Sequence, residues 1–438
     1  MKRMKQVLIY FTILFTIALT QAQSYDLDSF LSLVRQNNKD LKLAQKELDM
    51  AKAVKKEAWA TALPKIFAQG DYKRNLLENY LYVDFPDFRT GQLVKQKFKI
   101  SRNNEFRFNT VLQQTLFSFK VGDALRAAGQ YAGLTAEAYR ASYQGVTTAA
   151  KKLFYQALLL KKVMAITETA EKNAHENYLH VKDKFDQGLV SELELLQAEV
   201  RWRNEIPKVT EARKNYQIMM ANLKDFAGIP QDQPLKLQGS LENYPPKPKY
   251  VQTDSVLTKR PDFKALLWEK RLRQTNISSQ YAGYLPTLDG SFIFAYSSQS
   301  DAWKFENENK NFIIGLTLNI PIYTGGYTGA QVQKAKIDLA KTEIRIEKTK
   351  EKINNDLKSL YLKIDEAEQR IASARAAVTT AQKAFQIAQT SADNGVITQL
   401  DLKQTRLYLD QAMLNYYFAI YDYLAAYFDW QQATGEIN

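Results

Sequence analysis

Two short segments combine residue types that can end one helix, begin the next and present a carboxylate beside the turn. Each has a glycine, two apolar residues and a hydroxyl residue, with an acidic residue three positions after the hydroxyl. The two sets are Gly188, Leu189, Val190, Ser191 and Glu194, and Gly395, Val396, Ile397, Thr398 and Asp401. Glycine commonly ends helices, and serine or threonine caps the next helix by accepting a backbone N–H. The spacing from Ser191 to Glu194 predicts a good capping box, and that from Thr398 to Asp401 a weaker one.

The remaining composition offers little chemistry for catalysis. The 438 residues include no cysteine, which excludes disulfides, thiolate zinc sites and cysteine nucleophiles. The two histidines, His175 and His180, are five apart and therefore do not share a helix face as metal ligands would. The pair Gly325-Gly326 lacks the Gly-Lys-Ser/Thr of a phosphate loop. We therefore expect no catalytic site, no metal site and no cofactor.

The positive charge of the chain is spread along it. Lys and Arg number 60 against 47 Asp and Glu, a formal net charge of +13. The basic residues run through helical patterns without gathering into a patch, so we expect no nucleic-acid partner. Some of them are candidates to meet anionic lipid headgroups.

The N-terminus has the pattern of a secretory signal peptide. Three basic residues among the first five precede an uncharged run over 7–19 and a small-residue site ending at Ala22. We predict a signal peptide over 1–22, cleaved after Ala22. A retained membrane anchor is the alternative, and the run is shorter than the ~20 residues that a spanning helix needs.

The rest of the chain reads as two similar halves. The Leu-Pro pair ending at Pro64 recurs at Pro286, and one constant offset relates Gly188 to Gly395 and Gly228 to Gly435. Five of the eleven prolines lie between the halves. The predicted organisation is a first repeat over 23–228, a proline-rich linker over 229–259 and a second repeat over 260–438.

Each half contains two predicted strands, at about 65–74 and 105–117 and at about 287–298 and 311–323. They alternate apolar and polar residues over about ten positions, the pattern of outer-membrane strands. The last strand carries one apolar face made of Phe312, Ile314, Leu316, Leu318 and Ile320. A soluble antiparallel sheet would fit any single strand equally well. Because closed bilayer barrels start at about eight strands, a membrane role requires several chains to share one barrel.

Long coiled-coil helices follow the strands. From Ile353 to Ala392 apolar residues recur in alternating steps of four and three. The helix predicted from Tyr327 to Asn394 would be on the order of 100 Å long. A solvated structural coiled coil is the alternative, but it leaves the strands unexplained.

Taken in this order, the features resemble the TolC-like outer-membrane efflux family over about Tyr25–Gly435. They are the signal peptide, the duplicated Leu-Pro before a strand hairpin, Arg260-Pro261-Asp262 and the paired Gly-x-x-Ser/Thr turns. The resemblance implies a mostly α-helical homotrimer in the outer membrane of a Gram-negative bacterium. Four strands per chain would form a shared twelve-stranded β-barrel, continued by a coiled-coil helical barrel in the periplasm. Some relatives carry a lipid on an N-terminal cysteine, and this chain has none.

The resemblance also implies roles for the turns, at about 185–191 and 392–398. They would form the periplasmic tip, where the tunnel closes and an adaptor docks. Asp401 would contribute to an acidic constriction ring and Glu194 to the contacts that hold the gate. Gln404 departs from the family pattern, because well-known members carry a second Asp there. The adaptor-binding tip would comprise Gly188, Leu189, Val190, Ser191, Gly395, Val396, Ile397 and Thr398.

The function implied is a non-enzymatic exit duct of a tripartite efflux or type I secretion system. Its partners would be a periplasmic adaptor (membrane fusion) protein, an inner-membrane transporter and outer-membrane lipids. The alternative is a periplasmic coiled-coil adaptor or scaffold without a membrane barrel. The inserted loop over 75–104 is predicted to be extracellular, either plugging the barrel mouth or decorating it.

Overall fold

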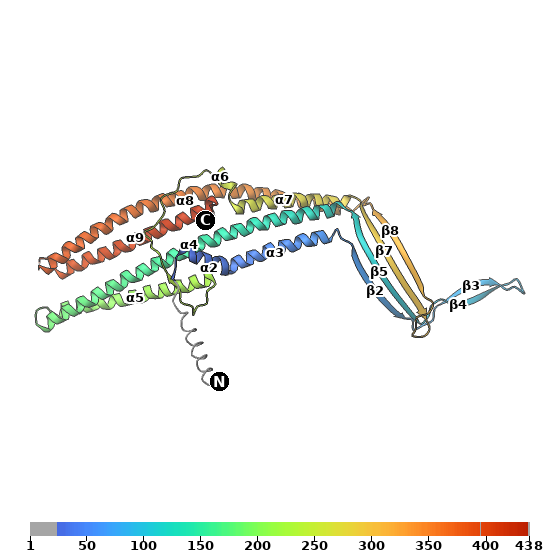
Figure 1. Ribbon diagram of the computed structural model, residues 1–438, viewed down its shortest axis with the longest axis horizontal. Helices are drawn as coiled ribbons and strands as arrows, with labels where there is room; N and C mark the ends of the chain where they lie inside the picture. The colour runs from blue at the N-terminus through green and yellow to red at the C-terminus, as the bar shows by residue number, and fades with distance from the viewer. Residues whose placement is uncertain (1–23, 395, 437–438) are drawn as a thin grey trace, which may run out of the picture. The chain divides into compact units, whose positions relative to one another are not determined.

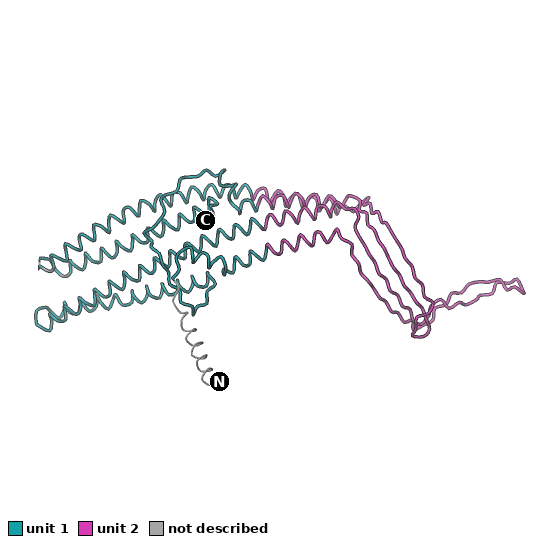
Figure 2. The backbone as a smooth tube through the Cα atoms, in the orientation of Figure 1, with its two compact units in different colours: residues 1–47, 136–265, 346–438 teal, residues 48–135, 266–345 magenta. Residues whose placement is uncertain are grey.

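The structure is a computed structural model that describes residues 24–394 and 396–436 (Figure 1). The predicted signal peptide over 1–22 and Gly395 lie outside the described residues. The chain divides into two compact units (Figure 2). Unit 1 takes its described residues from 1–47, 136–265 and 346–438, and unit 2 comprises 48–135 and 266–345.

Unit 1 is built mainly from helices, four of which also contribute residues to unit 2. The helices are α2 (Leu27–Asn37), α3 (Lys39–Ala60), α4 (Phe119–Asp186), α5 (Glu192–Ala227), α6 (Thr253–Leu257), α7 (Pro261–Tyr281), α8 (Tyr327–Asp393) and α9 (Gln399–Thr434). A 3-10 turn, η1 (Ala282–Tyr284), follows α7 in unit 2. A short parallel pair joins β1 (Ser24–Tyr25) to β6 (Lys236–Leu237) in unit 1. None of the helices within the described ranges is both long enough and apolar enough to cross a membrane.

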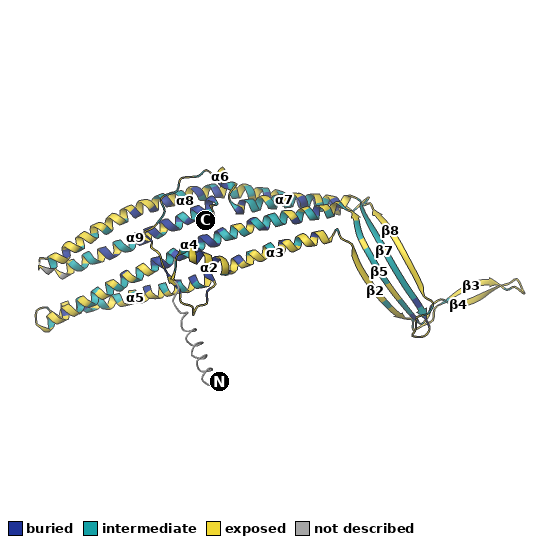
Figure 3. Cartoon of the chain, in the orientation of Figure 1, coloured by how far each residue is buried: buried dark blue, intermediate teal, exposed yellow. Residues whose placement is uncertain are grey.

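The core of unit 1 follows the apolar seam of α8 and the aromatic residues of α9. Leu357 and Ile364 lie seven residues apart on α8 and are fully buried, as the four-three spacing of apolar residues requires. Tyr423 and Trp430 on α9 are also seven apart and fully buried. Figure 3 shows the buried residues concentrated within the helical part and becoming sparse toward the two interhelical turns. The seam thus fixes which face of each long helix packs inward and leaves the turns exposed.

Unit 2 contains a four-stranded antiparallel sheet in the order β2-β5-β7-β8. The strands are β2 (Lys65–Arg74), β5 (Asn104–Phe117), β7 (Thr287–Ser300) and β8 (Asn309–Asn319). They lie where the alternation of apolar and polar residues predicts strands. The central strands pair across the two halves of the sequence, with Thr110 opposite Phe294. The outer strands β2 and β8 each have one neighbour and are largely exposed (Figure 3), so the sheet has two open edges.

The segment over 75–104 contains a second hairpin that the sequence analysis treated only as a loop. Strands β3 (Tyr80–Pro86) and β4 (Leu93–Lys99) pair in antiparallel register. Gly91 occupies the left-handed region with φ +74°, in the turn between the strands, which favours glycine. The run Tyr-Leu-Tyr-Val from Tyr80, which is rich in residues that favour strands, was the available signal.

Candidate functional site

The turn between α4 and α5 is shaped by glycine geometry. Gly188 has φ +73°, and a Cβ added there would meet no atom within 4 Å. The requirement for glycine therefore comes from the backbone conformation and not from crowding. The Gly188 N–H donates to the Phe185 carbonyl at 2.8 Å and the Leu189 N–H to the Lys184 carbonyl at 2.9 Å. These two bonds form the Schellman motif, which satisfies the last carbonyls of α4.

Ser191 caps the start of α5, but the predicted capping box is only half formed. Its Oγ accepts a hydrogen bond from the Glu194 N–H at 3.3 Å. Among the described residues, no return bond joins the Glu194 carboxylate to the Ser191 N–H. The prediction of a good box here was wrong, and Glu194 is exposed.

The turn between α8 and α9 carries the complete box that the sequence had ranked second. The Thr398 Oγ1 accepts from the Asp401 N–H at 3.2 Å, and Asp401 Oδ2 accepts from the Thr398 N–H at 3.3 Å. The Thr398 hydroxyl also donates to the same Oδ2 at 2.7 Å. The short Asp side chain keeps its carboxylate close to the backbone, so one oxygen meets both groups of Thr398. Asp401 is thus exposed but held by its own helix cap.

Gln404 lies three residues after Asp401 on α9, and both side chains are exposed. Residues three apart on a helix are neighbours on one face. The structure therefore brings two of the three predicted gate residues onto one exposed face of α9, with Asp401 in the first turn and Gln404 in the next.

The third predicted gate residue, Glu194, acts on a lysine of the other helical hairpin. Burial lowers the pKa of the Lys403 ammonium, and Arg201 of α5 lowers it further, while Glu194 opposes the shift. Glu194 of α5 and Lys403 of α9 therefore interact electrostatically. Arg201 and Lys403 also line one groove, within the first three turns of α5 and α9.

This groove, of about 210 Å³, lies between α4, α5 and α9. Its polar lining includes Asn173, Asn177, Arg201, Glu205, Lys403 and Gln404. In the same groove, Arg406 Nε donates to Asp410 Oδ1 at 3.1 Å. Burial raises the pKa of Asp410, and the Arg406 guanidinium counteracts part of that effect.

Sequence reasoning missed this charged layer. Its signal was the spacing of four residues from Arg406 to Asp410 on α9, which places a cation and an acid on one helix face. Both side chains are partly buried: 27% of the Arg406 side chain and 11% of the Asp410 side chain are exposed.

Apolar side chains are exposed at both turns. Leu189 is 68% exposed and Val396 is 75% exposed, whereas Val190 and Ile397 are half-buried. The structure adds Leu193 and Leu400, at 66% and 60%, which the sequence analysis did not single out. The repeat contained the signal, because each leucine stands two residues after its capping hydroxyl and one before the acid.

The apolar strand face predicted on β8 is exposed in the single chain. Phe312, Ile314, Leu316 and Leu318 are 57% or more exposed, as is Ile320 just after the strand. Phe312 packs on Phe294 of β7 with ring centroids 4.9 Å apart. The apolar face therefore continues from β8 onto β7.

No three His, Cys, Asp or Glu side chains gather within the described ranges as metal ligands would. His175 instead stacks on Trp202, with ring centroids 4.4 Å apart.

Comparison with known proteins finds one family over both halves of the chain. A family model described as "Outer membrane efflux protein" matches residues 30–228 and 253–436. The alkaline protease secretion protein AprF of Pseudomonas aeruginosa is 21% identical over 346 residues, covering 77% of this chain and 71% of AprF. The outer membrane protein TolC of Escherichia coli is 21% identical over 352 residues, covering 75% and 69%.

Solved structures share the fold. The CmeC outer membrane channel of Campylobacter jejuni superimposes with a TM-score of 0.77 at 20% identity, covering 93% of this chain and 85% of CmeC. The MtrE outer membrane channel of Neisseria gonorrhoeae gives 0.74 at 16% identity, covering 93% and 88%. The resemblance to the TolC-like family that the sequence indicated is thereby confirmed.

Proposed function

Because the chain belongs to the outer membrane efflux protein family, we propose that it is the outer-membrane exit duct of a tripartite efflux or type I secretion system. It is a transport protein of the Gram-negative outer membrane and not an enzyme. The observation that carries the proposal is the match of one family model to both halves of the chain.

The working form that we propose is a homotrimer with a twelve-stranded barrel. Each copy would contribute β2, β5, β7 and β8, with β8 of one copy pairing with β2 of the next. The two open edges of the sheet support this arrangement, because unpaired edges need partners. In that barrel the face bearing Phe312, Ile314, Leu316, Leu318 and Ile320 would contact lipid. We also propose that residues 1–22 are a cleaved signal peptide and that 23–228 and 260–438 are duplicated repeats joined by 229–259.

The helices would form a periplasmic tunnel that is closed at rest by acidic side chains. Asp401 of three copies would form one ring of carboxylates, with Gln404 beside it in place of a second acid. Glu194 would help to hold the closed state through its interaction with Lys403, which is supported by the opposition of Glu194 to the lowering of the Lys403 pKa by burial and Arg201. A ring of carboxylates around a narrow wet pore attracts cations. A single ring predicts weaker cation block than a double one.

A periplasmic adaptor would dock at the two interhelical turns, and an inner-membrane transporter would supply the cargo through it. The proposed adaptor-binding residues are Gly188, Leu189, Val190, Ser191, Gly395, Val396, Ile397 and Thr398. Exposed leucines at both turns, together with the exposed Val396, support this role, because contiguous exposed apolar surface marks interaction sites. Leu193 and Leu400 extend the same surface.

Two measurements on the full chain test the proposed duct. The protein should appear in outer-membrane fractions and migrate differently on electrophoresis before and after heating. Purified protein should conduct ions in planar lipid bilayers. A protein confined to the soluble periplasm, without conductance, would instead support the adaptor or scaffold alternative.

A further inference from the structure

The β3–β4 hairpin has two chemically different faces. Directly opposed residues of an antiparallel pair share a face. On one face Leu81 opposes Phe98 and Phe85 opposes Val94, with the Phe85 and Phe98 rings 5.8 Å apart. These four side chains are between 43% and 50% exposed. A two-stranded hairpin is marginally stable alone in water, so an exposed apolar face of this kind calls for a covering surface.

The opposite face is aromatic and cationic. Tyr80 opposes Lys99, Tyr82 opposes Lys97 and Asp84 opposes Lys95. The Lys97 ammonium lies 3.5 Å from the centroid of the Tyr80 ring. Lys95 and Lys97 against Asp84 give this face a positive charge, and lysines at alternate positions of a strand stand about 7 Å apart.

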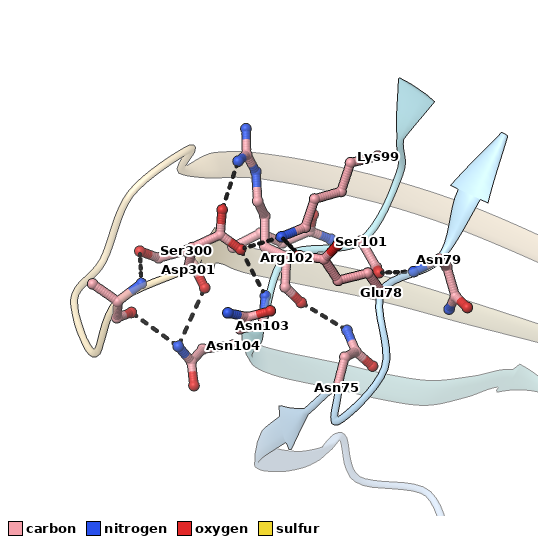
Figure 4. Close-up of polar contacts among 12 residues, drawn as sticks. Asn75, Glu78, Asn79, Lys99, Ser101, Arg102, Asn103, Asn104, Ser300 and Asp301 are labelled. Atoms are coloured by element: carbon pink, nitrogen blue, oxygen red, sulfur yellow. Dashed lines mark hydrogen bonds and ion pairs between the residues drawn. The ribbon is translucent and has the colours of Figure 1, made fainter. Parts of the chain in front are cut away.

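The root of the hairpin is fixed to the turn after β7 by a network centred on Asp301 (Figure 4). The carboxylate of Asp301 accepts from Arg102 Nη1 at 2.7 Å, from Lys99 Nζ at 3.1 Å and from the Asn103 N–H at 3.1 Å. Lys99 also pairs with Glu78 at 2.8 Å, which ties the two ends of the hairpin together. The hairpin therefore leaves the sheet from an anchored base.

An aromatic cluster surrounds the same end of the sheet. The Tyr72 ring lies 4.7 Å from Trp303, and the Phe106 ring lies 5.2 Å from Trp303 and 4.8 Å from Phe305. Trp303 is 71% exposed and Phe305 61%. The Tyr72 hydroxyl donates to Asn104 beside the hairpin root at 2.9 Å. Aromatic side chains concentrate at the membrane–water interface of barrel proteins, so in the proposed barrel this cluster would lie at headgroup level.

We propose that the β3–β4 hairpin is a membrane-surface anchor that lays its Leu81–Phe98 face against an anionic lipid surface, with its lysines near the headgroup phosphates. The inference rests on the proposed barrel, which would place the aromatic cluster at the interface. Apolar burial combined with attraction between lysines and anionic headgroups is how amphipathic elements bind membrane surfaces.

The absence of cysteine from the sequence allows a test with single labels. Three variants of the full chain, Val94→Cys, Asp84→Cys and Leu316→Cys, would carry an environment-sensitive fluorophore. Val94 lies on the apolar face of the hairpin, Asp84 on its cationic face, and Leu316 on the proposed lipid-facing strand. Each protein would be reconstituted into vesicles of phosphatidylcholine mixed with phosphatidylglycerol, with and without a lipid that carries a nitroxide quencher on its acyl chain.

The expected result is strong quenching at Leu316 and quenching at Val94 at least about twofold greater than at Asp84. Quenching at Leu316 with none at Val94 would overturn the anchor and leave the barrel standing. That result would mean a hairpin in solvent if aqueous iodide quenches the Val94 label, and a hairpin packed on another copy if iodide does not. Absence of quenching at Leu316 would contradict the barrel itself, and the anchor with it.

A charge variant tests the headgroup part of the inference. Lys95→Gln with Lys97→Gln leaves Lys99 and the root network intact. In the Val94→Cys background these changes should reduce quenching in vesicles that contain phosphatidylglycerol and have little effect in pure phosphatidylcholine. Equal quenching in both lipid compositions, with and without the lysines, would contradict the attraction to anionic headgroups.

Discussion

The Asp401 carboxylate accepts hydrogen bonds from both the backbone N–H and the hydroxyl of Thr398. The acid proposed for the gate therefore also holds the start of α9. Its charge and its capping role have to be separated experimentally, because an alanine substitution removes both. Glu194 at the matching position of α5 lacks this return bond to its cap, so the two repeats use equivalent acids differently.

The two caps should differ in strength. Thr398→Ala removes a complete box and should cost about 1 kcal/mol, which corresponds to about fivefold faster exchange of the first amide hydrogens of α9. Ser191→Ala removes one bond of 3.3 Å and should have a smaller effect on α5. Hydrogen exchange of the full-length protein measures both effects. Equal effects at the two positions would contradict the asymmetry.

Asp401→Asn should weaken cation block while preserving the turn, because the amide oxygen of Asn can still accept from Thr398. Loss of an interaction of about 1 kcal/mol between a carboxylate and a cation in a wet pore would raise the half-blocking cation concentration about fivefold. Thr398→Ala is the matched control, since it disturbs the cap and keeps the charge. Single-channel recording in planar bilayers provides the measurement, and unchanged block in Asp401→Asn would remove Asp401 from the gate.

Breaking the ion pair between Arg406 and Asp410 should lower the free energy of unfolding, because it leaves a partly buried charge without a partner. Arg406→Met should destabilise the helical hairpins by about 2 kcal/mol, because it leaves the Asp410 carboxylate without its cation. Adding Asp410→Asn should restore most of the loss. Burial already raises the pKa of Asp410, so the penalty in Arg406→Met should shrink as the pH falls and the carboxyl becomes neutral. Thermal unfolding of the two variants and the unmodified protein tests this, and a penalty independent of pH would contradict it.

The hairpin root should resist acid. Arg102, with Asn103 and Lys99, lowers the pKa of Asp301 to about 2. Because this pKa is below that of an unfolded Asp, the contribution of Asp301 is complete above the ordinary Asp pKa of about 3.9 and is lost as the pH falls through about 2. The Asn103 amide should therefore stay protected from hydrogen exchange from about pH 5 to about pH 3, after correction for intrinsic rates.

Asp301→Asn is the control for this prediction. It should lower Asn103 protection at neutral pH and abolish its dependence on acid. Loss of protection already near the ordinary Asp pKa in the unmodified protein would show that the network does not hold the carboxylate ionised.

The sequence predicted the long elements because their patterns repeat many times. Leu357 and Ile364 belong to a seam that recurs over the whole of α8, and the alternation in β8 extends over its length. The predicted order of the two capping boxes was wrong: the box at Thr398 is complete and the one at Ser191 is half formed. Capping depends on where one carboxylate oxygen lies relative to the backbone. Spacing alone does not distinguish Glu194 from Asp401 in that respect.

The groove between α4, α5 and α9 and the two faces of the β3–β4 hairpin could be identified only from the tertiary structure. Lys403 and Arg201 are two hundred positions apart in the sequence and meet only when the two helical hairpins pack. The amphipathic character of β3 and β4 becomes visible once Leu81 is known to oppose Phe98. Leu193 and Leu400 could have been predicted from the sequence, because they occupy matching positions in the two repeats.

The most direct test of the proposed duct is cross-linking between the open strand edges. In the cysteine-free chain, one cysteine on β2 and one on β8 would be placed in pairs that scan the possible registers. A barrel shared by three copies predicts oxidised ladders of monomer, dimer and trimer in outer-membrane fractions, with cross-linking at alternate positions along one register. Monomers alone at every register, or ladders that continue beyond the trimer, would contradict a closed barrel of three copies.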